Sequence, residues 1–106
     1  MISERTPAAV VESLRGDDPP LLVDVREHWE RGLAAIPCSL HLPMGEIPTR
    51  LTELPRDREL VLYCHHGARS RQVAHFLSLH GFDRLSNLDG GIDAWSQRVD
   101  PSIPTY

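Results

Sequence analysis

The segment from Leu60 to Arg71, LVLYCHHGARSR, joins an apolar run to a glycine-containing loop that opens with Cys64. The apolar run predicts a buried strand over residues 59–63, and the residues after the loop have the apolar spacing of a helix. A strand that passes into a helix is half of the unit from which parallel α/β sheets are built. The loop between them places a thiol where backbone N–H groups and a helix N-terminus converge, and these groups favour an anion.

Strand and helix patterns alternate along the rest of the chain. Near its beginning, Thr6 and Pro7 predict a helix start, because threonine caps helix N-termini and proline suits the first helical position. In chain order, the predicted elements are a helix over residues 8–15, a strand over 21–25, a helical turn over 27–31, a short strand over 39–42, a helix over 44–54, the strand over 59–63, a helix capped by Ser70 or a neighbour and stopped by Gly81, a strand over 85–88 and a short helix through Trp95. This alternation predicts an α/β domain with a largely parallel sheet.

The length and composition of the chain fit one domain. A chain of 106 residues, of which 41% are hydrophobic, can bury a core without disulfides. We therefore expect a single domain over residues 1–106, with its core at about residues 5–98 and a C-terminal tail over residues 99–106.

Cysteine usage, hydropathy and net charge exclude several classes of protein. Two cysteines, Cys38 and Cys64, are no disulfide framework, and the N-terminus lacks the apolar run of a signal peptide. No apolar stretch approaches membrane-spanning length, so we expect a cytoplasmic protein without a membrane partner. The net charge of −4 gives no indication of binding to nucleic acid.

The distribution of charge is more informative than its total. Residues 60–82 contain no Asp or Glu, whereas Arg69, Arg71 and four of the six histidines fall within this window. An acidic chain with one locally positive segment around Cys64 is expected to bind a small anion there.

Three motifs in this order resemble the single-domain rhodanese family of sulfurtransferases. They are LVDVRE over residues 22–27, CHHGARS over residues 64–70 and NLDGGIDAW over residues 87–95. The resemblance covers nearly the whole chain. It implies a rhodanese-like α/β domain, with a central, mainly parallel five-stranded sheet flanked by helices on both faces. It also implies a nucleophilic Cys64 at the C-terminal end of a central strand.

The resemblance also implies a reaction. The Cys64 thiolate would take the outer sulfur of thiosulfate or of a persulfide donor and hold it as a persulfide. The sulfur would then pass to cyanide or to a thiol, including a thiol on a protein partner. This chemistry requires no cofactor and no metal. The expected donor-binding residues follow the nucleophile directly in the sequence: His65, His66, Gly67, Ala68, Arg69 and Ser70.

Other functions remain open on the same residues. Cysteine-dependent phosphatases, one branch of which shares this fold, place five residues between cysteine and arginine, whereas four separate Cys64 from Arg69. The shorter loop favours a sulfur atom over a phosphate ester. Arsenate reduction, a persulfide carrier and a non-catalytic binding module are also compatible with this loop. A metal site built from Cys38, His41, Cys64 and His65 lacks the spacing of zinc motifs.

One departure from the family concerns residues 35–39, AIPCS, where the family often has His-Ile-Pro-Gly-Ala. Cys38 stands in place of the usual glycine, and we expect it to be a structural or partly exposed thiol. Elsewhere, Trp29 and Trp95 are expected in the core, and Asp24 is expected to tie neighbouring loops together. For Arg26, a surface or ion-pair role and an approach to the site are both open.

Overall fold

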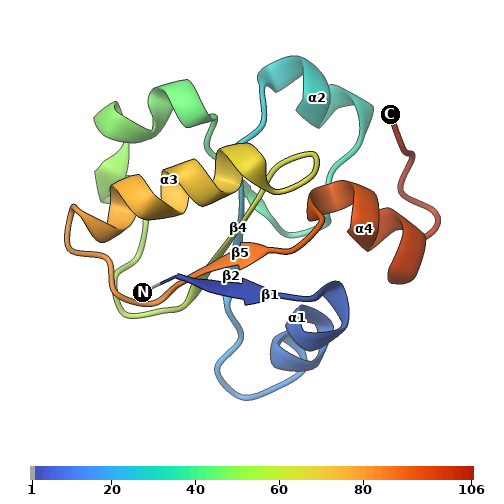
Figure 1. Ribbon diagram of the computed structural model, residues 1–106, viewed down its shortest axis with the longest axis horizontal. Helices are drawn as coiled ribbons and strands as arrows, with labels where there is room; N and C mark the ends of the chain where they lie inside the picture. Colours follow the sequence, from blue (N-terminus) through green and yellow to red (C-terminus); the bar gives the residue numbers. More distant parts are fainter. Residues whose placement is uncertain (1) are drawn as a thin grey trace.

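Five parallel strands form the centre of the computed structural model, which describes residues 2–106 (Figure 1). Their order across the sheet is β1-β5-β4-β2-β3, and every pairing between neighbours is parallel. The strands are β1 (Ser3–Arg5), β2 (Leu21–Asp24), β3 (Leu40–His41), β4 (Leu60–Tyr63) and β5 (Leu85–Leu88). The predicted parallel α/β sheet is therefore confirmed.

Helices cover both faces of this sheet. The α-helices are α1 (Pro7–Leu14), α2 (His28–Leu33), α3 (Ala68–Ser78) and α4 (Gly91–Arg98), and two 3₁₀ helices, η1 (Met44–Thr49) and η2 (Leu51–Glu53), precede β4. Figure 1 shows α3 on one side of the strands and α1 on the other. Within residues 2–106, no helix has the length and apolar character needed to cross a membrane.

The central strand β4 is buried on both sides because its side chains alternate between two cores. Leu60 and Leu62 pack with the core under α3, whereas Val61 and Tyr63 pack with residues from α1 and α4. In the parallel register, Asp24 of β2 pairs with Tyr63 of β4. The segments that follow these strands therefore meet at one edge of the sheet, the edge at which open α/β sheets bind ligands.

Residues 44–54 are helical as predicted, but they form two short 3₁₀ helices rather than one continuous helix. This segment forms η1 and η2, separated at Arg50, whose φ of −124° is outside the helical range. Pro48 lies inside η1 and has no N–H to donate to an α-helical ladder, so the tighter and shorter 3₁₀ turns form instead.

The first helix begins as predicted, whereas the first strand, Trp29 and the last residues differ from the sequence prediction. Thr6 caps α1 as predicted, accepting a hydrogen bond from the Ala9 N–H at 3.2 Å. The strand β1 was not predicted, because Ser3–Arg5 is short and polar and pairs only at the sheet edge. Trp29 lies on the surface, with 65% exposure, which corrects the core assignment. Residues 99–106 fold back onto the domain rather than trailing from it, since Ile103 is buried in the core.

Candidate active site

Cys64 follows β4 directly and lies beneath the loop that leads into α3. The residue is 1% exposed. Its Sγ accepts hydrogen bonds from the Gly67 N–H at 3.1 Å, the Ser70 N–H at 3.5 Å and the Ser70 hydroxyl at 3.4 Å. The loop thus turns several donors toward a single sulfur atom, as the sequence predicts.

These donors decide the ionisation of the thiol. Burial alone raises the pKa of Cys64, because the charged form loses water. The Ser70 hydroxyl and the backbone N–H groups of Ser70, Gly67 and Arg69 outweigh that effect, and the net shift lowers the pKa. A thiol with a lowered pKa provides more thiolate, which is the nucleophilic form.

The helix after the loop begins earlier than a cap at Ser70 or a neighbour would place it. Gly67 is the N-cap of α3, in the left-handed region at φ 113°, and the helix starts at Ala68. Ser70 lies in the first turn, where its single hydroxyl proton is shared between Cys64 Sγ and Asn87 Oδ1, and its side chain does not cap the helix. The left-handed turn requires glycine, because a side chain at this φ is strained.

The side chain of Asn87, on the neighbouring strand β5, holds the Cys64 loop in place through hydrogen bonds. Its Nδ2 donates to the Gly67 carbonyl at 3.1 Å, and its Oδ1 accepts from the Ser70 hydroxyl. The residue is fully buried. Asn87 belongs to one of the three family motifs, but the sequence alone assigns it no role. The signal that could have revealed its role is the presence of a polar residue within a buried strand.

The N-terminus of α4 closes the other side of the loop. The Ile92 N–H donates to the Cys64 carbonyl at 2.9 Å, and the Asp93 N–H donates to the His65 carbonyl at 3.2 Å. Gly91 comes so near to these carbonyls that a Cβ there would lie 2.4 Å from the His65 oxygen. Gly91, the first residue of α4, therefore lets the helix pack closely against the loop, in addition to allowing the turn that the sequence predicts for Gly90 and Gly91.

The arginines near Cys64 are not free charges, contrary to the expectation of a positive segment. Arg69 forms a bidentate ion pair with Glu30 of α2, at 2.6 and 2.9 Å. Arg71 pairs with Glu4 of β1 at 2.9 Å. Both carboxylates belong to segments that are remote in the sequence. Residues 60–82 contain no acidic residue, but in the folded protein acidic side chains from other segments pair with the arginines of this window.

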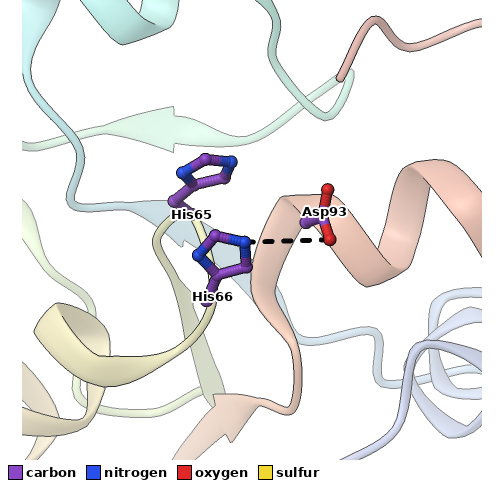
Figure 2. Close-up of side chains that lie close together, drawn as sticks. All are labelled: His65, His66 and Asp93. Atoms are coloured by element: carbon purple, nitrogen blue, oxygen red, sulfur yellow. Dashed lines mark ion pairs between the residues drawn. The ribbon is translucent and has the colours of Figure 1, made fainter. Parts of the chain in front are cut away.

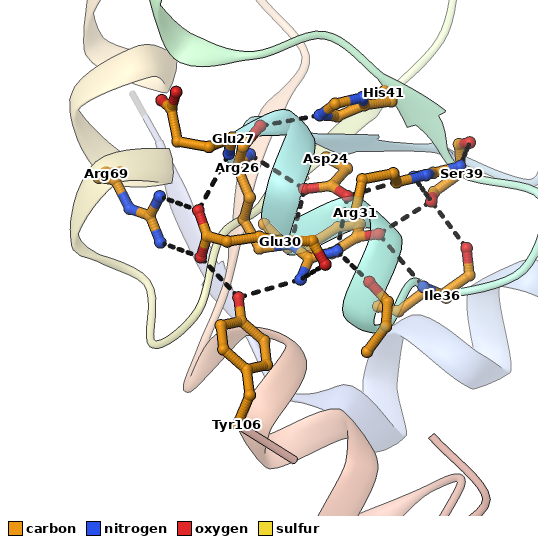
Figure 3. A network of polar contacts seen from close by, with 12 residues as sticks. Asp24, Arg26, Glu27, Glu30, Arg31, Ile36, Ser39, His41, Arg69 and Tyr106 are labelled. Atoms are coloured by element: carbon orange, nitrogen blue, oxygen red, sulfur yellow. Dashed lines mark hydrogen bonds and ion pairs between the residues drawn. The ribbon is translucent and has the colours of Figure 1, made fainter. Parts of the chain in front are cut away.

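Glu30 is 2% exposed and satisfied on both oxygens. The Arg69 guanidinium, outweighing the loss of water, lowers the pKa of Glu30 to about 2. In addition to Arg69, Oε1 accepts from the Glu27 N–H at 2.9 Å, and Oε2 accepts from the Tyr106 hydroxyl at 2.6 Å (Figure 3). The geometry thus makes Glu30 the partner that holds the Arg69 side chain.

A fully buried ion pair supports this region from β2 (Figure 3). Arg26 bonds to Asp24 through Nε at 2.9 Å and Nη2 at 2.8 Å, and donates to the carbonyls of Glu30 and Ala34. These bonds attach the middle of α2 and its C-cap to the Arg26 side chain, so Arg26 takes the ion-pair role and Asp24 ties neighbouring segments together. Despite burial, the mutual attraction lowers the pKa of Asp24 and raises that of Arg26.

The two histidines after the nucleophile lie in different surroundings (Figure 2). The His65 ring stacks on His66, with 3.9 Å between centroids and 27° between planes, and its Nε2 is buried without a hydrogen bond. His66 is exposed and lies 3.8 Å from an Asp93 oxygen. Burial lowers the pKa of His65, an effect to which the charge of His66 adds.

These histidines and Asp93 place potential ligand atoms within 4.8 Å of one another. Imidazole lone pairs lie in the ring plane, however, and stacked rings direct theirs along separate planes rather than at one ion. The set Cys38, His41, Cys64 and His65 is not gathered into a metal-binding group among residues 2–106. The arrangement at the loop therefore fits an anion better than a metal ion.

Cys38 is an exposed free thiol at φ 65°, which matches the partial exposure expected. This left-handed backbone gives the family's usual glycine at the position a physical reason. The remaining predicted site residue, Ala68, is exposed in the first turn of α3.

The Glu30–Arg69 pair predicts a pH-dependent contribution to stability. The pKa of Glu30 is lower in the folded protein than its ordinary value, so its contribution is complete above about pH 4.5 and is lost as the pH falls toward 2. Allowing for the partial water exposure of Arg69, we expect Glu30→Gln to lower the free energy of unfolding by about 2 kcal/mol at neutral pH. Urea unfolding at pH 7 and pH 3 measures the difference, which should shrink at pH 3. Glu12→Gln, at an exposed position, is the matched control, and an equal loss at both pH values would contradict the prediction.

Together, the parallel sheet and the ring of N–H donors define an α/β domain with an anion site centred on a cysteine. The sequence model of the family described as "Rhodanese-like domain" matches residues 6–98, and the chain belongs to this family.

Two relatives and one solved structure extend over nearly the whole chain. A protein of Allochromatium vinosum named "Sulfurtransferase" is 40% identical over 103 residues, covering 97% of this chain and 96% of the relative. "Putative sulfurtransferase YtwF" of Bacillus subtilis is 37% identical over 100 residues, covering 94% and 96%. The crystal structure of a rhodanese-like domain protein from Staphylococcus aureus superposes with a TM-score of 0.85 at 28% identity, covering 99% of both chains. The rhodanese-like fold is therefore confirmed.

Proposed function

We propose that this protein is a sulfurtransferase that carries sulfane sulfur as a persulfide on Cys64. The observation that carries the proposal is the cradle at Cys64, in which backbone N–H groups and the Ser70 hydroxyl surround a buried sulfur with a lowered pKa. Sulfurtransferase names among relatives of nearly the same length support the class of reaction.

The first half of the proposed reaction loads the cysteine. The Cys64 thiolate attacks the outer sulfur of thiosulfate or of a persulfide donor, and a new S–S bond forms. The original bond to that sulfur breaks, and sulfite or the donor thiolate leaves with the electron pair. Donor, leaving group and product are all anions, so preorganised N–H donors at the cradle favour each of them.

The second half returns the enzyme to its starting state. A thiolate or cyanide attacks the outer sulfur of the persulfide, and Cys64 leaves as a thiolate. No electrons are gained or lost overall, and no metal or cofactor takes part. Arg69 contributes through its fixed charge near the sulfur, since Glu30 holds its guanidinium, rather than as a freely moving donor clamp.

Competing functions on this fold receive less support. A phosphatase would need arginine to bind phosphate oxygens, whereas Arg69 already donates from both Nη1 and Nη2 to Glu30, which leaves fewer of its five N–H donors for a phosphate. A persulfide carrier would use the same first half and differ only in its acceptor. We further propose a reducing compartment such as the cytoplasm as the place of action, since the chemistry needs a free thiol.

Sulfur loading tests the proposal directly. Intact mass spectrometry before and after incubation with thiosulfate, and separately with glutathione persulfide, should show the gain of one sulfur atom. Addition of cyanide should remove it as thiocyanate. A protein that gains no sulfur from either donor, although its Cys64 still reacts with an alkylating agent, would contradict the proposal, and turnover of a phosphate ester would then favour the phosphatase.

A further inference from the structure

Tyr106 reaches the Cys64 loop from a segment that the sequence presents as a tail. After α4, residues 99–106 turn back at Asp100, whose carbonyl accepts a hydrogen bond from the Ile103 N–H at 3.1 Å. The Ile103 side chain is 6% exposed and packs into the core that contains Trp95. The segment is thus anchored by apolar burial, which fixes where Tyr106 lies.

The ring and the hydroxyl of Tyr106 make different contacts. Its ring lies flat on the His65 imidazole, with 4.0 Å between centroids and 7° between planes. Its hydroxyl donates to Glu30 at 2.6 Å and accepts from Arg26 Nη1 at 2.9 Å (Figure 3). Burial raises the pKa of Tyr106 to about 12, so the hydroxyl keeps the proton that it donates.

These contacts reach both ends of the anion cradle. His65 is the residue directly after Cys64. At the other end, the carboxylate that accepts from the Tyr106 hydroxyl also holds Arg69, whose backbone N–H helps to lower the pKa of Cys64. The Tyr106 side chain therefore contacts the start of the loop, at His65, directly. It is linked to the end of the loop, at Arg69, through Glu30.

We propose that Tyr106 is a positioning residue for sulfur transfer, in which its ring fixes the His65 end of the Cys64 loop and its hydroxyl fixes the Arg69 end through Glu30. The inference deepens the proposed function and rests on it for the reaction concerned. Its physical content is separate, because it states that Tyr106 maintains the donors around the Cys64 sulfur.

Two substitutions separate the two contacts. Tyr106→Phe keeps the ring on His65 and removes the hydroxyl, whereas Tyr106→Ala removes both. Thr105→Ala, at the exposed neighbouring position, leaves Tyr106 in place and is the matched control. All variants are made in a Cys38→Ser background, so that Cys64 is the only thiol.

The pH dependence of Cys64 alkylation by iodoacetamide is the first readout. A loosened loop stabilises the thiolate less, so we expect alkylation at neutral pH to slow about threefold in Tyr106→Phe and about tenfold in Tyr106→Ala, with the profile displaced to higher pH. Among the neighbours, ion pairing raises the pKa values of Arg69 and Arg71, so both stay charged throughout the series, whereas burial lowers the pKa of His65 and so disfavours its charged form.

The second readout is sulfur transfer from thiosulfate, where misplaced donors should raise KM for the donor and lower kcat/KM by about the same factors as alkylation. Melting temperatures show whether each variant is folded. If the variants melt earlier but alkylate along the profile of the Thr105→Ala control, Tyr106 only stabilises the fold and the inference is wrong. A wild-type protein that alkylates at low pH but loads no sulfur would overturn the proposed function alone, because the alkylation readout does not depend on it.

Discussion

Replacement of Cys64 by serine is expected to reduce sulfur transfer by about a thousandfold or more, to the background rate. A serine hydroxyl stays protonated at neutral pH, and its oxygen cannot hold sulfane sulfur as a persulfide. The fold should survive, because a serine oxygen can accept the hydrogen bonds from Gly67 and Ser70 that the sulfur accepts in the wild-type protein. Steady-state thiocyanate formation and intact mass spectrometry measure the loss, and the melting temperature measures the fold.

Cys38→Ser is the control for this prediction. Cys38 is exposed, and none of the hydrogen bonds to Cys64 Sγ within residues 2–106 involves it, so this variant should load and transfer sulfur at the wild-type rate. Sulfur bound by the Cys64→Ser protein and released as thiocyanate would place the reactive thiol at Cys38 and end the proposed mechanism. Loss of activity in both single variants would instead indicate that two thiols share the reaction.

Much of this architecture is readable from local sequence patterns. The runs at residues 21–24 and 60–63 are short and mainly apolar, as expected of strands buried on both faces of a parallel sheet, whereas the buried strand at residues 85–88 also carries two polar side chains. The loop from Cys64 to Ser70 is readable for a related reason. Its glycine, its cysteine and the helix that follows are contiguous, so the convergence of N–H groups on the sulfur is a local consequence of the chain.

The features that could not be predicted from the sequence are those that depend on contacts between residues remote in the chain. The sequence presents Arg69 as a cation without a partner, yet Glu30, 39 residues earlier, forms an ion pair with it. Tyr106 looks like part of a tail, yet its hydroxyl meets Arg26 and Glu30, 80 and 76 residues earlier. No periodicity signals such pairings, because they arise only once the sheet has brought the carboxyl ends of its strands to one edge. A candidate site can therefore be found from a motif, whereas its electrostatics require the fold.

The contact between α4 and the Cys64 loop predicts that Gly91→Ala has the second largest effect. Gly91 is in the left-handed region at φ 61°, and a Cβ there would lie 2.4 Å from the His65 carbonyl oxygen and 2.5 Å from that of Cys64. Both are backbone atoms, so either the loop or the start of α4 must move. Backbone strain and the clash together should lower the free energy of unfolding by about 3 kcal/mol. Because displaced donors misplace the sulfur, kcat/KM should also fall about a hundredfold.

Gly81→Ala separates the two causes. Gly81 is also left-handed, at φ 89°, but a Cβ there would meet only the flexible Arg56 guanidinium, at 3.0 Å. This control therefore carries the backbone strain without contact to the loop, and it should cost about 1 kcal/mol with unchanged transfer. Denaturant unfolding and steady-state kinetics of both variants, at a temperature where each is folded, make the comparison. If Gly91→Ala transfers sulfur as fast as Gly81→Ala, the position of the Cys64 and His65 carbonyls does not govern the cradle, and the role assigned to α4 is wrong.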